Sequence, residues 1–169
     1  MKYALILLVF FVASTTIACK SSKSKKRSYI RSAYLELKDS FPNSDVVLLH
    51  DSIQLIFPEN IMFNLNSADL LPSFQSKLNR FCRILNKYNK TNILTTGHTD
   101  NSGEESFNMK LSNDRAVNVK QRMIEQQVQE GRIFTWGLGD KSPILSNTTA
   151  EGRAKNRRVE FVILFAPKT

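Results

Sequence analysis

The order of strand-like and helix-like hydrophobic patterns along the sequence constrains the fold of this chain more than any other sequence feature. Short β-branched and apolar runs, typical of strands, lie at residues 46–50, 53–57, 92–96, 133–137 and 158–165. Apolar residues spaced by three and four, which indicate amphipathic helices, run from about 70 to 88 and from about 106 to 127. The resulting order, β-β-α-β-α-β-β, predicts an α+β fold in two layers, with helices packed on one face of a mixed β-sheet.

Three further parts of the chain have weaker patterns. Residues 28–42 are loosely periodic before Pro42 and predict a marginal helix or a linker. Residues 138–156 are rich in turn formers and predict a polar loop. Cys82 lies on the apolar stripe of the first predicted helix, so we interpret it as a small core residue, with a reactive thiol as the alternative.

The first residues of the chain have the pattern of an export signal. Lys2 precedes an apolar stretch from Tyr3 to Val12, and small or hydroxylated residues then lead to Cys19. An apolar run of this length is typical of a secretory signal, because a bilayer span needs about 20 apolar residues. We therefore expect residues 1–18 to be absent from the mature protein.

The residues before Cys19 carry a second signal. The sequence Thr16-Ile-Ala-Cys19 resembles the bacterial lipobox, in which a small residue precedes the cysteine that becomes lipidated, although Thr16 replaces the usual leucine. The resemblance implies a lipid anchor on Cys19, and acyl chains contribute about 0.8 kcal/mol per buried methylene to membrane attachment. The alternative is an ordinary signal peptide that is followed by a cysteine of no special role.

A basic segment follows the cysteine. The chain has a net charge of +9, and Lys2 together with the five cations of residues 20–27 carries most of it, so that the rest is only mildly basic. Such a segment predicts an extended, solvated linker. It either attracts anionic lipid headgroups or acts as a spacer. Nucleic acid is an improbable partner class, because aromatic residues are not interleaved with the basic ones.

Four polar segments next to these elements carry the strongest functional signal. They are residues 63–67 (FNLNS), 97–103 (GHTDNSG), 108–116 (NMKLSNDRA) and 147–158 (NTTAEGRAKNRR). In this order they resemble the motifs of the OmpA-like peptidoglycan-binding domain, which outer membrane protein A, peptidoglycan-associated lipoproteins and flagellar stator proteins share. The likeness covers about residues 53–164. It predicts three parts: a signal peptide at 1–18, a lipidated tether with a marginal helix at 19–44, and an OmpA-like domain at 45–166.

The resemblance implies non-covalent binding of peptidoglycan through the diaminopimelate of its peptide stem. The free end of diaminopimelate carries an ammonium and a carboxylate. The aspartate of the family's HTD motif falls on Asp100, and the arginine of its LSxxRA motif falls on Arg115. A carboxylate suits the ammonium, and a guanidinium suits the carboxylate through two parallel charge-assisted hydrogen bonds. We expect both side chains to line an exposed polar pocket, with a mutual surface ion pair as the structural alternative.

The resemblance also implies neighbours for this pair. Asn108, with backbone N–H groups at the start of its helix, Asn66 and Arg157 are the further ligand-binding candidates. Asn66 stands where many family members have aspartate. Phe107 and Asp140 replace a common tyrosine and glutamate. Of the basic residues at 153–158, at least one is expected to have a packing or pairing role instead.

Catalysis is the weaker functional hypothesis. His98 with Asp100 and nearby Ser102 or Ser112 resembles a hydrolytic triad only superficially, since triads are defined by geometry. The sequence therefore predicts a protein that is not an enzyme and needs no metal or other cofactor. We expect an outer membrane lipoprotein that faces the periplasm and tethers the membrane to the wall, with other envelope proteins as further partners. An envelope interaction module with little wall affinity is the alternative.

Overall fold

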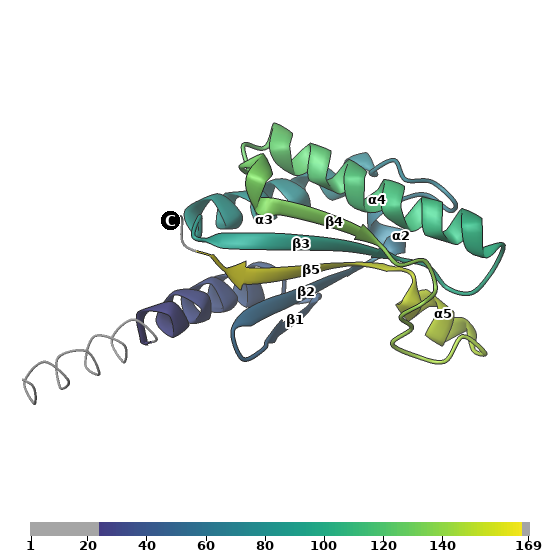
Figure 1. Cartoon of the computed structure of the whole chain (residues 1–169), viewed down its shortest axis with the longest axis horizontal. Helices are drawn as coiled ribbons and strands as arrows, with labels where there is room; N and C mark the ends of the chain where they lie inside the picture. Colours follow the sequence, from purple (N-terminus) through teal and green to yellow (C-terminus); the bar gives the residue numbers. More distant parts are fainter. Residues whose placement is uncertain (1–23, 167–169) are drawn as a thin grey trace, which may run out of the picture.

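A five-stranded mixed sheet organises the protein in the computed structural model, which describes residues 24–166 (Figure 1). The strand order is β1-β2-β5-β3-β4, and only β3 and β4 are parallel neighbours. The strands are β1 (Asp45–Leu48), β2 (Ser52–Pro58), β3 (Thr91–His98), β4 (Ile133–Gly137) and β5 (Arg158–Phe165). All five predicted strands are therefore confirmed, with ends that differ from the prediction by at most two residues.

Two long helices follow the predicted order. They are α3 (Gln75–Lys87), which a short turn η1 (Pro72–Phe74) precedes, and α4 (Glu105–Glu125). Three shorter elements lie between the strands: α2 (Glu59–Met62), η2 (Glu130–Arg132) and α5 (Ala150–Asn156). The helix α5 corrects the prediction of a loop throughout 138–156. It has no apolar stripe to signal it, and it begins where the hydroxyl of Thr149 accepts a hydrogen bond from the Gly152 N–H, at 3.0 Å.

Residues 24–40 form another helix, so the prediction of an extended linker is wrong for residues 24–27. The prediction of a marginal helix also understates this element. Ile30, Ala33 and Leu37 lie on one face of it and are buried in the core. The ring of Phe41, just after the helix, packs edge to face on a core ring of β2. Tertiary packing of this face stabilises the helix more than its basic start opposes it. Residues 1–23, with the predicted signal and Cys19, lie outside the described residues.

The core lies between the helices and the inner face of the sheet. Phe57 of β2, Phe81 of α3 and Phe161 of β5 are fully buried and contact one another edge to face. Cys82 is buried beside them, and burial raises the pKa of its thiol to about 12. A thiol that stays protonated is a poor nucleophile, which favours the interpretation of Cys82 as a core residue.

Two paired glycines bring α4 unusually close to the sheet. Gly97 of β3 and Gly137 of β4 are neighbours in register. A Cβ at Gly97 would lie 2.0 Å from the Ser112 carbonyl oxygen, and one at Gly137 would lie 2.5 Å from the Asn113 backbone nitrogen. This close approach fixes the middle of α4 against the ends of the two strands, and with it the position of Arg115.

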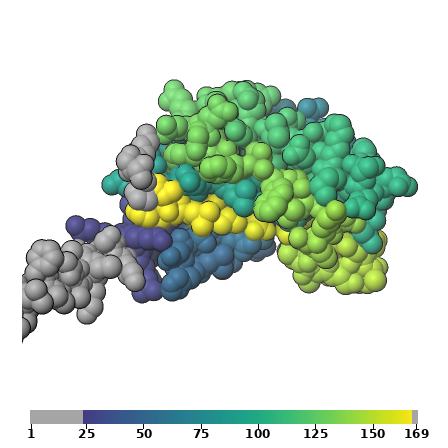
Figure 2. Space-filling model, in the orientation of Figure 1, coloured from purple at the N-terminus to yellow at the C-terminus, as the bar shows by residue number. Residues whose placement is uncertain are grey.

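The outer face of the sheet is largely open to solvent, and β5 crosses the middle of the visible surface (Figure 2). Phe134 and Trp136 of the edge strand β4 are 52% and 57% exposed. The segment before α5 folds against one end of the sheet, where Arg158 donates a hydrogen bond to the Ser142 carbonyl. Among residues 24–166, no helix is long and apolar enough to cross a bilayer. The same residues hold no cluster of three or more potential metal ligands among His, Cys, Asp and Glu.

Candidate ligand-binding site

One end of the sheet brings together charged residues that are far apart in the sequence. Pro58, the last residue of β2, and His98, the last residue of β3, both pair with Arg158, the first residue of β5. The residues next to these positions therefore meet. They include Glu59 after β2, Asp100 two residues beyond β3, and Arg157 before β5.

Asp100 is 6% exposed and has two partners on its carboxylate. One oxygen accepts the Ser102 backbone N–H at 2.8 Å, and the other accepts Nη1 of Arg157 at 2.6 Å. Burial alone would raise the pKa of this carboxyl, but the hydrogen bonds from Arg157 and Ser102 outweigh it and lower the pKa below its usual range. Asp100 is therefore an oriented anion at neutral pH.

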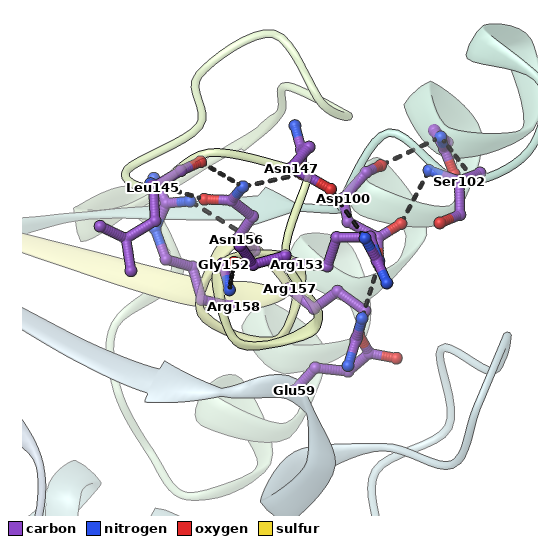
Figure 3. Close-up of polar contacts among 12 residues, drawn as sticks. Glu59, Asp100, Ser102, Leu145, Asn147, Gly152, Arg153, Asn156, Arg157 and Arg158 are labelled. Carbon is purple, nitrogen blue, oxygen red and sulfur yellow. Dashed lines mark hydrogen bonds and ion pairs between the residues drawn. The ribbon is translucent and has the colours of Figure 1, made fainter.

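Arg157 bridges two carboxylates, as Figure 3 shows. Besides Asp100, its Nε lies 3.2 Å from Oε2 of Glu59, an ion pair without the alignment of a hydrogen bond. Its side chain is 33% exposed, more than that of either carboxylate. Arg157 is thus the solvent-facing member of the group.

Arg115 lies deeper than the sequence predicts. It is 1% exposed, whereas the resemblance led us to expect a side chain in an exposed pocket. It falls on the buried face of α4, which Ser112, Ala116 and Val119 share, so the helix carries it under the loop of residues 63–70. Asp100 and Arg115, the two residues predicted to bind the ligand, are not paired with each other either, since the partner of Asp100 is Arg157.

The partner of Arg115 is Glu59. Nη2 of Arg115 donates to Oε1 of Glu59 at 2.6 Å, Nε donates to the Ser67 carbonyl at 2.9 Å, and the guanidinium lies 5.1 Å from the centre of the Phe63 ring. Glu59 is 6% exposed. The four side chains thus form a continuous chain of ion pairs, Asp100–Arg157–Glu59–Arg115, with two charges of each sign.

The sequence interpretation missed Glu59. A signal was present: it is the one charged residue between Ile53 and Phe63, in a segment that is otherwise mainly apolar. A carboxylate in such a place is rarely buried without a cationic partner. The sequence alone could not identify that partner, because Arg115 is 56 residues away.

Asn108 shapes the loop that carries Asp100. It is 3% exposed, and its Nδ2 donates to the carbonyls of Asp100 and Ser102 at 3.2 and 3.0 Å. Its backbone N–H donates to the Glu104 carbonyl and is therefore engaged within the first turn of the helix. The position supports an indirect role for Asn108, in which it holds Asp100 in place. Direct contact with a ligand stays a prediction.

Asn66 lies in the loop that covers Arg115. It is exposed and has a φ of 57°, in the left-handed region that asparagine tolerates better than most residues. The next residue, Ser67, supplies the carbonyl that accepts Nε of Arg115. The turn at Asn66 thus directs this carbonyl at the guanidinium, and a ligand contact from its own side chain stays a prediction.

Other polar side chains of the fourth segment, residues 147–158, hold a loop in place. Asn156 is fully buried, and its side-chain amide bonds the backbone of Ile144 and Leu145 (Figure 3). Arg153 donates to the Asn147 carbonyl at 2.8 Å, and Arg158 is buried beneath the same segment. The expectation that some of these arginines have a packing role is confirmed.

The side chains proposed for hydrolysis do not form a catalytic group. His98 is 3% exposed, and neither ring nitrogen has a hydrogen-bond partner among the described residues. The Ser112 hydroxyl instead donates to the Met109 carbonyl and accepts the Gly139 N–H, both at 2.9 Å. No serine is positioned for activation by His98 in this part of the chain.

This chain is similar to a family of known proteins. A family model described as the OmpA family matches residues 62–157, more than half of the chain. The chain belongs to the OmpA family. The matched segment contains Asn66, Asp100, Asn108, Arg115 and Arg157, whereas Glu59 lies just before it.

Two curated members of the OmpA family illustrate the likeness. The probable lipoprotein YiaD of Escherichia coli K12 is 43% identical over 113 residues, which are 67% of this chain and 52% of YiaD. The peptidoglycan-binding protein ArfA of Mycobacterium tuberculosis H37Rv is 39% identical over 115 residues, which are 68% of this chain and 35% of ArfA. The chain therefore spans about half of one relative and about a third of the other.

Solved structures show the same fold. The cell wall anchor of the T6SS from Pseudomonas aeruginosa is similar to this chain with a TM-score of 0.69 and 32% identity. The match covers 79% of this chain and 94% of that structure. The predicted fold class, an OmpA-like α+β sandwich, is confirmed.

Proposed function

We propose that this protein binds peptidoglycan without modifying it, through the diaminopimelate of the peptide stem, and so tethers a lipid-anchored envelope protein to the cell wall. Membership of the OmpA family supports the proposal. So do the names of its relatives, which include a peptidoglycan-binding protein and a cell wall anchor. The activity needs neither a cofactor nor a catalytic residue.

The ion pair between Asp100 and Arg157 is the observation that carries this proposal. A zwitterion can insert between these two side chains and leave no charge unpaired. Its ammonium replaces Arg157 as the partner of Asp100, and its carboxylate binds the guanidinium that is released. A buried charge without a partner costs free energy. A ligand with only one charge would leave either Asp100 or Arg157 unpaired and would therefore bind less favourably. The partial exposure of Arg157 gives the ligand a way in.

Arg115 has a second place in the proposed site. Its contacts to Glu59 and Ser67 use Nη2 and Nε, and we assign the remaining terminal nitrogen, Nη1, to the ligand carboxylate. Glu59 lies between the two guanidinium groups, since each of its oxygens faces a different arginine. The carboxylate would thus be bound by charges that are already fixed in position.

The location of the protein is part of the same proposal. The pattern that ends at Cys19 implies export, cleavage after residue 18 and lipidation. Relatives include lipoproteins and outer membrane proteins. We therefore place this protein on the outer membrane, with the domain that follows the anchor in the periplasm and without a nucleic-acid partner.

Co-sedimentation with diaminopimelate-containing sacculi tests the proposal. A protein of residues 20–169 contains the whole core and lacks Cys19, so an acyl chain contributes nothing to its retention. Asp100→Asn keeps the size of the side chain but removes its charge. We expect the parent to sediment with sacculi and Asp100→Asn to stay in solution.

Asp114→Asn is the matched control. Asp114 is a partly exposed aspartate on α4 that pairs with Lys110 and is not a member of the chain of three ion pairs. It should bind sacculi as the parent does. Failure of the folded parent to bind, or equal binding by Asp100→Asn, would overturn the assignment.

An envelope interaction module with little wall affinity is the second candidate, and the open sheet face favours it. Phe134 and Trp136 are large apolar side chains exposed on this face. Under this alternative, the parent would not sediment with sacculi, and Trp136→Ser would abolish the capture of envelope proteins while Asp100→Asn would not.

A further inference from the structure

A hollow lies at the opposite end of the sheet from the candidate site. It is an open pocket of about 720 Å³ between the helix of residues 24–40 and the turn that joins β1 to β2. A smaller hollow of about 240 Å³ adjoins it and has Ile30 and Leu48 in its lining. The larger pocket is lined by Ser24, Lys26, Arg27, Ser28, Arg31, His50 and Asp51.

Positive charge dominates this pocket. Arg27 and Arg31 are exposed and lie one turn apart on the helix, so both guanidinium groups project from the same side. Asp51 is the acidic residue of the lining, and Lys26 already pairs with it at 2.9 Å. Among residues 24–166, no ion pair includes Arg27 or Arg31. The side chain of His50 is 84% exposed at the same rim.

The pocket and the candidate site are separated by the length of the sheet. Strand β2 begins at Ser52, beside the pocket, and ends at Pro58, beside Glu59 of the site. Seven residues of strand span about 20 Å. Figure 1 shows the same relation, with the N-terminal helix at one end of the molecule and α5 at the other.

We propose that this pocket docks the domain on an anionic membrane surface by binding phospholipid headgroup phosphates. Two guanidinium groups one turn apart can each make paired hydrogen bonds to phosphate oxygens, and the serine hydroxyls of the lining add donors. The charge is complementary to that of anionic lipid, and the apolar Ile30 and Leu48 lie just behind it. Docking by this end points the candidate site away from the bilayer.

Vesicle binding tests the docking surface without relying on an anchor or on wall binding. The protein of residues 20–169 is mixed with vesicles of phosphatidylcholine alone and with vesicles that also contain phosphatidylglycerol. We expect binding only to the anionic vesicles and weakening by salt. Each basic residue near such a surface contributes about fivefold to affinity, so Arg27→Gln with Arg31→Gln should reduce binding about 25-fold.

Lys77→Gln with Lys155→Gln is the matched control, because it removes the same charge from exposed positions outside this pocket. It should bind anionic vesicles within about twofold of the parent, a change expected from net charge alone. Equal losses in the two double variants would overturn the proposal, as would a parent that does not bind anionic vesicles at low salt.

Discussion

The two ends of the sheet differ in how their charged side chains are buried and paired. At one end, Asp100, Glu59 and Arg115 are almost fully buried and are linked to one another through ion pairs and Arg157. At the other end, Arg27 and Arg31 are exposed at the rim of an open pocket. Buried charges interact strongly and are costly to separate, whereas exposed charges are screened and contribute little to stability. The first end is therefore suited to recognising one geometry, and the second to attracting a charged surface.

The two histidines of the chain repeat this contrast. His50 lies at the open end, and its side chain is 84% exposed. His98 lies at the buried end and is 3% exposed, with Arg158 nearby and Oε2 of Glu160 3.9 Å from its Nε2. The same residue type is thus exposed at one end and buried at the other. Substitutions of the two histidines can therefore test the contrast between the two ends.

Removing Arg115 should have the largest effect on stability. Arg115→Met leaves Glu59 buried without its closest partner, and breaking a buried pair in this way costs about 3–5 kcal/mol of the free energy of unfolding. Urea denaturation measures this loss. A loss below about 1 kcal/mol would contradict the view that the buried end depends on its ion pairs.

Two variants control for this result. Arg122→Met removes an exposed arginine of the same helix, paired with Glu125, and should change stability by less than about 0.5 kcal/mol. Glu59→Leu combined with Arg115→Met removes both buried charges and should recover more than half of the loss, because no charge is then left alone.

Acid should destabilise the protein through His98. Burial, with a smaller effect of the nearby Arg158 cation, lowers the pKa of His98 from 6.5 to about 4. Below pH 6.5 the unfolded chain takes up this proton and the folded protein does not, so the free energy of unfolding falls as the pH falls. The decline continues until about pH 4 and totals about 3 kcal/mol. Urea denaturation between pH 7 and pH 4 measures it.

Substitutions of the two histidines separate this effect from that of the carboxylates. His98→Gln should flatten the decline between pH 6.5 and pH 4, whereas His50→Gln, at the exposed end, should keep it. If the profile of His98→Gln ran parallel to that of the parent, the buried histidine would not be its cause.

The exposed end should show the smallest effect on stability. Arg27→Gln with Arg31→Gln removes two charges that make no ion pair within residues 24–166. Its free energy of unfolding should stay within about 0.5 kcal/mol of the parent. A larger loss in urea denaturation would show that these arginines support the helix, and the contrast between the two ends would fail.

Periodicity predicted most of the fold. The strands could be identified as short β-branched and apolar runs, and the two helices α3 and α4 by apolar residues that repeat every three to four positions. The helix of residues 24–40 was underestimated for a physical reason. Its apolar face is narrow, and Lys25, Lys26 and Arg27 are typical of a solvated chain. The packing of this face in the core, which stabilises the helix, cannot be recognised from the local sequence. The short helix α5 has no such face, so only its cap at Thr149 signals it.

The candidate site was predicted only in part. Asp100 and Arg115 were identified from motifs, and Arg157 was expected as a neighbour. The burial of Arg115 was not predicted, because it depends on the loop around Ser67 folding over α4. The linking role of Glu59 depends on the ends of three strands meeting, which local sequence does not encode.

Titration with two soluble stem peptides tests the central claim most directly. One peptide contains diaminopimelate, and the other has lysine in its place, which keeps the ammonium and lacks the second carboxylate. If the site binds a zwitterion between Asp100 and the two arginines, calorimetry should show that the diaminopimelate peptide binds about 30-fold more tightly than the lysine peptide. This difference corresponds to the charge-assisted hydrogen bonds that the lysine peptide cannot make. Equal affinity for the two peptides would contradict the account.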